Sequence, residues 1–264
     1  MLYVVGTPIG NIQDISTRAV ETLQKVDLIA CEDTRHTGLL LSRLGIKKPL
    51  ISYYQHTEEA RTALLVEKLK EGQNIALVSD AGMPVISDPG AVLVEAAHKE
   101  GLAVSVVPGP TAVTSAVALA GIRGGFVFIG FLAEKNKDKE GQITPFITSP
   151  LPLVFYCASH DLADTFSFLL GLLGDRRVWV VKELTKMYEG VFDTRLSGEI
   201  DFDTHGEFVL IVEGKAPTAL TALPPVEHLR RYLELGMDKK EAIKRVAAER
   251  GVKKDEIYKI ALEL

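Results

Sequence analysis

The chain has 264 residues and a formal net charge of −5 at pH 7. Its content of 47% hydrophobic and 25% charged residues is typical of a soluble globular protein and excludes disorder as the overall state. The length allows two modest domains or one large one, and the acidic balance gives no overall electrostatic footprint for nucleic acid.

Cysteine usage and apolar runs set further limits. Cys31 and Cys157 lie in apolar, strand-like surroundings and form no C-x-x-C pair, so we expect neither a disulfide nor a metal site. No secretory signal precedes Leu2, which favours the reduced cytoplasm. The uncharged run 102–122 contains Pro108-Gly109-Pro110, and we therefore expect a strand, a loop and a helix there, with no contact with a membrane.

Residues 1–122 repeat a strand, a loop and a helix. Strands are predicted at 2–5, 28–31, 49–54, 74–78 and 103–107. Helices are predicted from a Ser16 cap to about Val26, from His56 to about Glu71, and after the loops that end near Gly90 and Pro110. His56 is expected to be a surface or capping residue. The pattern predicts a parallel sheet covered by helices, with the strand ends along one edge.

The loop from Ser79 to Gly90 is the central feature of the sequence. It reads S-D-A-G-M-P-V-I-S-D-P-G and lies between a predicted buried strand and a predicted helix. Ligands bind at this edge of open α/β sheets, where helix N-termini present free N–H groups and glycine allows close backbone approach. Because most βα connections take about two to six residues, a longer loop predicts ligand binding rather than a plain turn.

Two other loops at the same edge carry polar or small residues. Residues 6–11, G-T-P-I-G-N, are by themselves as consistent with a turn as with a binding loop. Residues 32–37, E-D-T-R-H-T, follow the second strand and face the same edge. The alternative for this cluster is that Asp33 or Thr34 caps a helix.

A second domain is predicted at 123–215, after the glycine-rich linker 121–125. Its strands are expected at 126–132, 152–156, 177–181, 191–200 and 206–213, with a helix at 162–173. The last strands lack a long crossover helix, which predicts a mixed sheet. The charged segment 133–141 is expected to be a mobile surface loop.

Residues 216–264 are predicted to form a helical extension that leans basic. A helix is expected at 226–235, and Asp238 opens a second helix with a capping-box pattern. Its expected inward residues are Ala242, Ile243, Val246 and Ala247. Gly251 ends this helix and Asp255 begins another. The pair resembles a helix-turn-helix, although such pairs also serve as plain packing units.

Together, four motifs resemble the tetrapyrrole-methylase family. They are V-G-T-P-I-G-N, A-C-E-D-T-R-H-T, S-D-A-G-M-P-V-I-S-D-P-G and V-P-G-P-T-A. More narrowly, they resemble its branch of small-subunit (16S) ribosomal RNA cytidine 2′-O-methyltransferases, over residues 2 to about 214. The resemblance implies an α/β fold of two αβα domains, S-adenosylmethionine in the cleft between them, and a homodimer.

The resemblance also implies cofactor-binding positions in both domains. In the first domain they are Pro8, Asp80, Gly82, Met83, Pro84, Ser87, Thr111 and Ala112. In the second they are Tyr156, Cys157 and the backbone near Leu184. The segment 182–186, K-E-L-T-K, fits the family's R-E-L-T-K closely. Residues 155–161 depart from the usual F-Y-E-S-P-H-R, and 130–133 depart from G-F-L-P; these changes bear on catalysis or RNA placement rather than on cofactor binding.

Methyl transfer to a ribose hydroxyl needs in-line alignment and a base within hydrogen-bond reach. The candidate bases are Glu32, Asp33, Asp80, His160, Glu183 and Lys186. We predict that Asp33 is the base and that Arg35 and Lys186 hold RNA phosphate and offset the carboxylates.

The predicted function is therefore S-adenosylmethionine-dependent 2′-O-methylation of small-subunit ribosomal RNA, either free or in the 30S particle. One alternative is methylation of a tetrapyrrole, because a fold does not fix a function. Another is a non-catalytic RNA-binding or assembly protein that keeps the cofactor site. Lys135, Lys137, Lys139 and the basic tail are expected to contact the RNA.

Overall fold

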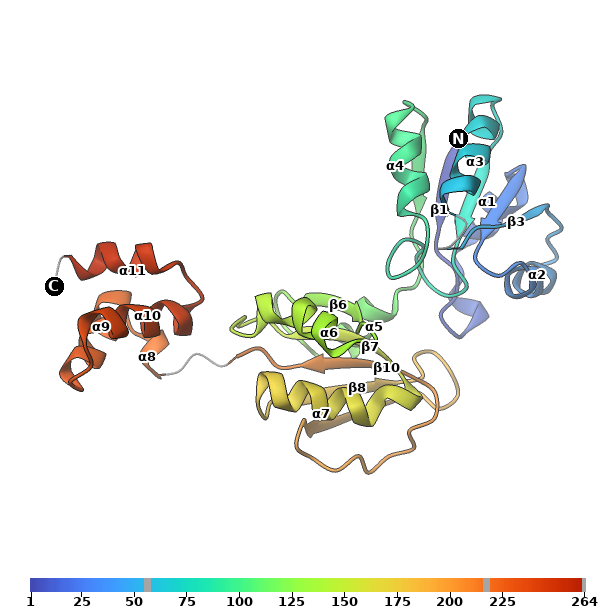
Figure 1. Ribbon diagram of the computed structural model, residues 1–264. Helices are drawn as coiled ribbons and strands as arrows, with labels where there is room; N and C mark the ends of the chain where they lie inside the picture. Colours follow the sequence, from blue (N-terminus) through green and yellow to red (C-terminus); the bar gives the residue numbers. More distant parts are fainter. Residues whose placement is uncertain (55–57, 216–218, 263–264) are drawn as a thin grey trace. The chain divides into compact units, whose positions relative to one another are not determined.

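The structure is a computed structural model that describes residues 1–54, 58–215 and 219–262. It divides into two compact units, one of residues 1–122 with 181–191 and the other of residues 123–180 with 192–264 (Figure 1). His56 lies outside the described residues. No helix in the described part of the chain is long and apolar enough to span a membrane.

The first unit is built on a parallel sheet. Its strands are β1 (Leu2–Val5), β2 (Leu28–Cys31), β3 (Leu50–Ser52), β4 (Ile75–Val78) and β5 (Val104–Val107). Their order is β3-β2-β4-β1-β5, and every neighbouring pair is parallel. All four residues of β2 and of β4 are buried, as expected for strands covered on both faces. The predicted parallel sheet is confirmed.

Helices flank the strands of this unit. They are the 3₁₀-helix η1 (Ile12–Asp14), α1 (Thr17–Lys25), α2 (Thr34–Arg43), α3 (Glu58–Lys70), α4 (Ala91–Lys99) and α5 (Ala112–Leu119). Side chains cap four of them: Asn11 accepts from Gln13 N, Ser16 from Ala19 N, Asp33 from Arg35 N, and Thr111 from Thr114 N. Capping by Asp33, the alternative for the 32–37 cluster, is thus observed.

Apolar side chains on the two sheet faces belong to separate clusters. Leu2, Ala30 and Leu77 pack in one cluster, with Leu65 and Leu93 of α3 and α4. Successive residues of a strand point to opposite faces, so the neighbours of these residues lie in the other cluster. Its buried members are Val5, Ala19, Leu23, Val26, Ile29, Cys31, Leu41, Ile46, Ala76, Val78 and Val107. Both faces of the sheet are therefore covered by apolar side chains, and the ends of the strands connect to the loops.

The second unit has a mixed sheet, as predicted. Its strands are β6 (Val127–Phe131), β7 (Leu153–Ala158), β8 (Arg177–Lys182), β9 (Gly190–Arg195) and β10 (Glu207–Val212), in the order β6-β7-β10-β8-β9. Strand β7 pairs parallel with β6 and antiparallel with β10. Its helices are α6 (Asn136–Ile143), α7 (Leu162–Leu173) and the 3₁₀-helices η3 (Thr144–Phe146) and η4 (Ser159–Asp161).

The expectation of a surface loop at 133–141 is wrong, because most of this segment lies in α6. Ile143 at the end of the helix is fully buried in the core of the unit. The Gln142 side chain accepts from Ala133 N at 2.9 Å and donates to Phe131 O at 3.2 Å. These tertiary contacts outweigh the weak helix propensity of a charged, glycine-containing segment.

The tail forms a small helical cluster of its own. It contains α8 (Ala219–Ala222), α9 (Pro225–Glu234), α10 (Lys239–Arg250) and α11 (Lys254–Ala261). Asp238 Oδ2 accepts from the N–H groups of Lys240 and Glu241, as the capping pattern predicted. The four residues predicted to face inward on α10 are all buried. Gly251 adopts a left-handed φ of 67° and ends that helix.

Candidate cofactor and acceptor site

Three loops of the first unit meet at the carboxyl edge of its sheet. Thr7 N donates to Gly82 O at 2.8 Å, and Gly82 N donates to Thr7 O at 3.2 Å. A Cβ added to Gly6 would lie 2.7 Å from the Cα of Gly109, closer than real Cβ atoms come. Glycine at 6 and 109 is therefore a requirement of the contact between the first and the last of these loops.

The β4–α4 loop has an unusual backbone. Left-handed φ values occur at Gly82 (85°), Val85 (77°), Ser87 (65°) and Gly90 (135°). For the β-branched Val85 this conformation costs about 1–3 kcal/mol. The hydroxyl of the buried Ser79 donates toward Gly82 O at 3.2 Å and helps to hold the loop. Such strain persists where the surroundings impose it, which is typical of ligand-binding loops.

The cofactor positions implied for the first unit all lie on these three loops. Pro8 directly follows Thr7, which forms a β-bridge with Gly82. The Met83 Sδ lies 2.7 Å from the position that a Cβ added to Gly6 would take. The remaining positions are Asp80, Gly82, Pro84 and Ser87 on the β4–α4 loop, and Thr111 and Ala112 at the start of α5. The structure thus brings the residues from the β1, β4 and β5 loops together. Their role in binding stays a prediction.

Carboxylates gather beside the same loops. Burial raises the pKa of Glu32, and the charges of Asp80 and Asp33 add to the effect. Burial also raises the pKa of Asp88 to about 6, with the charges of Glu32 and Asp80 as further causes. Asp88 was not among the residues singled out from the sequence. Its signal was present, since it is the second carboxylate of the S-D-A-G-M-P-V-I-S-D-P-G loop.

Asp33 has a different environment. Its carboxylate accepts from Arg35 N at 2.7 Å, from Arg35 Nε at 3.3 Å and from Arg35 Nη2 at 2.9 Å. The side-chain hydrogen bond from Arg35 is the largest cause that lowers the pKa of Asp33 to about 2. A carboxylate with so low a pKa has little tendency to take a proton near neutral pH, so the structure argues against the predicted base.

Residues 183–186 lie against the first loop. Asn11 N donates to Thr185 Oγ1 at 3.0 Å, and a Cβ on Gly10 would lie 2.6 Å from Lys186 Cγ. Lys186 Nζ pairs with Glu183 Oε1 at 2.9 Å, and Leu184 is buried. Two candidate polar residues, Glu183 and Lys186, are therefore paired with each other beside residues 6–11. Leu184 was expected in the second domain, but residues 181–191 belong to the first unit.

The implied positions in the second unit have their own surroundings. The ring of Tyr156 meets the rings of Phe128 and Phe131 edge-on, at centroid distances of 4.9 and 5.3 Å. Burial raises the pKa of the Cys157 thiol to about 11, so this group is neutral at physiological pH. His160 is exposed, and its Nε2 lies 3.3 Å from Asp161 Oδ2.

The residues of the first unit fit S-adenosylmethionine. This cofactor carries a sulfonium, an ammonium and one carboxylate, and the carboxylates of Glu32 and Asp80 beside the loops complement its net positive charge. The close contact of Gly6 with Gly109 leaves no room for a Cβ at either position, so backbone groups and the Met83 side chain make up the loop junction. Gly82 also has a φ of 85°, a value that residues other than glycine seldom adopt.

Comparison with known proteins supports this interpretation. Residues 1–198 match the family described as Tetrapyrrole (Corrin/Porphyrin) Methylases. The chain is 43% identical to "Ribosomal RNA small subunit methyltransferase I" of Halalkalibacterium halodurans over 98% of this chain and 93% of the relative. It is 42% identical to the protein of that name from Haemophilus influenzae, over 99% of this chain and 96% of the relative.

Solved structures share the fold. A crystal structure of the methyltransferase CobJ aligns with a TM-score of 0.63 at 18% identity, covering 81% of this chain and 94% of that one. A crystal structure of diphthine synthase aligns with a TM-score of 0.62 at 14% identity, covering 80% and 89%. Together with the two α/β sheets of the structure, these neighbours confirm the predicted fold class. The chain belongs to the tetrapyrrole methylase family and is a methyltransferase whose methyl donor is S-adenosylmethionine.

Proposed function

We propose that the chain methylates the 2′-hydroxyl of a cytidine in small-subunit ribosomal RNA. The observation that carries this proposal is the identity of 43% to a protein named "Ribosomal RNA small subunit methyltransferase I", which extends over 98% of the chain. A match of that extent includes residues beyond the 198 that the family description covers. The helical tail is therefore part of what is shared with the named relatives.

The tetrapyrrole alternative has weaker support. A uroporphyrin-III-C-methyltransferase from Thermus thermophilus aligns with a TM-score of 0.54, at 20% identity. Likeness at that level concerns the fold, and a fold hosts many substrates. The non-catalytic alternative loses its basis, since the chain belongs to a family of methyltransferases.

For the mechanism we propose Asp88, assisted by Glu32, as the proton acceptor. Bound S-adenosylmethionine supplies an electrophilic methyl carbon on a positively charged sulfur. The chain must align the acceptor hydroxyl and take its proton. Asp88 has a pKa of about 6, close to the working pH and well above that of Asp33. It is ionised at neutral pH and still has an appreciable proton affinity.

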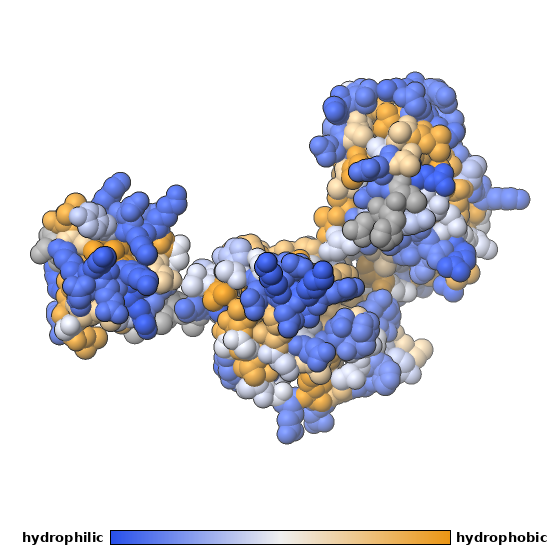
Figure 2. Space-filling model, in the orientation of Figure 1, coloured by the Kyte–Doolittle hydropathy of each residue, from blue (hydrophilic) through white to orange (hydrophobic). Residues whose placement is uncertain are grey.

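RNA phosphates are proposed to bind exposed cations on α6 and on the tail. Lys135 and Lys137 are exposed at the start of α6, whereas Lys139 Nζ lies 5.5 Å from the ring centroid of Phe168. The tail exposes further cations, and hydrophilic side chains cover much of its visible face (Figure 2). Arg35 and Lys186 are proposed to contact RNA near the acceptor. We further propose a cytoplasmic homodimer, for which the molar mass in solution is the test.

The decisive experiment offers labelled S-adenosylmethionine with three acceptors: purified small ribosomal subunits that lack the modification, the free RNA, and a uroporphyrin-type tetrapyrrole. We expect label in the RNA of the subunits, recovered after digestion as 2′-O-methylcytidine. Label in the tetrapyrrole alone would replace the RNA proposal with the alternative. Label on a base, rather than on the ribose, would refute the proposed acceptor atom.

A further inference from the structure

An aromatic side chain lies exposed at the turn between β8 and β9, within the first unit. Glu189 N donates to Lys186 O at 3.2 Å and closes the turn, which places Met187 and Tyr188 at its two central positions. Met187 is 88% exposed and Tyr188 is 72% exposed. No hydrogen bond or ring contact of the Tyr188 side chain occurs within the described part of the chain.

The turn is held in place by its neighbours. Thr185 N donates to Glu189 Oε2 at 2.6 Å, and the Thr185 hydroxyl accepts from Asn11 N at 3.0 Å. Glu183 and Thr185 have left-handed φ values of 49° and 64°. Non-glycine residues keep such values only where the surroundings enforce them. Tyr188 is therefore presented on a fixed support beside loop 6–11, and little backbone entropy is lost when it binds a partner.

The surroundings of Tyr188 favour a nucleobase over a second protein surface. The turn is flanked by the ion pair of Lys186 with Glu183 and by Glu189, which accepts from Thr185 N, whereas the centre of a protein–protein interface is depleted of charged residues. A flat, exposed ring is suited to an unpaired base, because every base offers a π-face. When a ribose of an RNA strand occupies the acceptor site, the neighbouring bases of that RNA strand also lie near the site. RNA-binding proteins stack such unpaired bases on aromatic rings.

We infer that Tyr188 stacks on an unpaired nucleobase of the RNA substrate and so positions the strand beside loop 6–11. This inference rests on the proposed function. It makes Tyr188 a positioning residue for the RNA, with no part in cofactor binding or in proton transfer. Its contribution should appear in the affinity for RNA. It should require an aromatic ring at position 188 but not the tyrosine hydroxyl.

The test compares Tyr188→Ala, Tyr188→Leu and Tyr188→Phe in the full-length protein, with unmodified small ribosomal subunits as acceptor. We expect the KM for subunits to rise about tenfold in the Ala and Leu variants and to stay near wild type in the Phe variant. Tenfold corresponds to about 1.4 kcal/mol, within the range for one stacked base. The Kd for S-adenosylmethionine should be the same in all four proteins.

Three results would overturn the inference. The first is an unchanged KM in Tyr188→Ala while the wild type methylates subunits, which leaves the proposed function intact. The second is a lower molar mass of Tyr188→Ala in light scattering, which would make the turn a contact between copies of the chain. The third is the absence of transfer to RNA by the wild type, which would remove the proposed function as well.

Discussion

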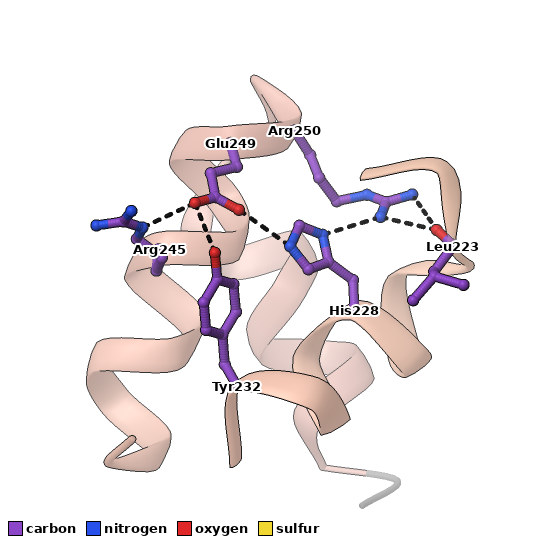
Figure 3. Close-up of polar contacts among 6 residues, drawn as sticks. All are labelled: Leu223, His228, Tyr232, Arg245, Glu249 and Arg250. Carbon is purple, nitrogen blue, oxygen red and sulfur yellow. Dashed lines mark hydrogen bonds and ion pairs between the residues drawn. The ribbon is translucent and has the colours of Figure 1, made fainter. Parts of the chain in front are cut away.

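Replacement of Glu249 by alanine is expected to loosen the helical tail, because this carboxylate joins three other side chains. It accepts from His228 Nε2 at 3.0 Å, from Tyr232 Oη at 2.7 Å and from Arg245 Nε at 2.7 Å (Figure 3). Arg250 Nη1 lies 3.2 Å from His228 Nδ1 and 2.9 Å from Leu223 O. Arginine only donates hydrogen bonds, so His228 Nδ1 accepts from Arg250. The ring proton is then on His228 Nε2, which donates a hydrogen bond to Glu249.

The expected magnitude follows from the burial of His228, which has no exposed surface. Without Glu249 its N–H donor is buried and has lost its acceptor, which costs about 1–3 kcal/mol. Loss of the Tyr232 hydrogen bond adds about 0.5–1.5 kcal/mol. The sum is about 1.5–4.5 kcal/mol, since the exposed pair with Arg245 contributes little. Glu234→Ala is the matched control, because it breaks an exposed pair with Arg231 and should change almost nothing.

Hydrogen exchange read by peptide is the appropriate assay, because a protein with several units has no single free energy of unfolding. In Glu249→Ala the protection of α9, α10 and α11 should fall by a factor between about 10 and about 2,000, at about 1.4 kcal/mol per tenfold. Protection in β1–β5 should stay unchanged. Equal exchange in Glu249→Ala and Glu234→Ala would refute the assigned role of the network.

The same network gives the pH dependence a definite sign. Burial lowers the pKa of His228, and the neutral ring is the form that accepts from Arg250. Burial raises the pKa of Glu249, but hydrogen bonds from Tyr232, Arg245 and His228 outweigh it and leave that pKa lowered. Both groups therefore stabilise the tail above their unfolded pKa values and lose that effect as the pH falls. Protection factors in α9–α11 should decrease from pH 7 to pH 5, and an increase would contradict this account.

Three other variants test the candidate site. Gly6→Ala should abolish S-adenosylmethionine binding in calorimetry, because its Cβ would lie 2.7 Å from Gly109 Cα, whereas Gly141→Ala, which meets nothing within 4 Å, should bind normally. Wild-type kcat should rise with pH through about 6 as Asp88 ionises, and Asp88→Asn should lose most activity together with that limb of the profile; an unshifted limb would exclude Asp88. Asp33→Asn should keep activity within a few fold, since asparagine also caps helices, and a loss of a thousandfold would restore Asp33 as the base.

Local sequence patterns determined most of the elements. The strands of the first sheet, the Ser16 cap of α1 and the tail helix opened by Asp238 follow from hydrophobic periodicity and from capping residues near in sequence. The convergence of loops at one edge also followed, because parallel strands all end on the same side. These features depend on interactions between residues close together along the chain, or on a repeat that the sequence displays directly.

The tertiary structure decided features that depend on distant residues. The burial of Ile143 made a helix of a segment whose composition predicted a loop. The contact of Gly10 with Lys186 joins residues from opposite halves of the chain, and no local pattern indicates it. The pKa values of Asp33 and Asp88 differ because one carboxylate meets Arg35 and the other is buried near two carboxylates. Titration depends on solvent exposure and on neighbouring charges, which a one-dimensional sequence does not contain.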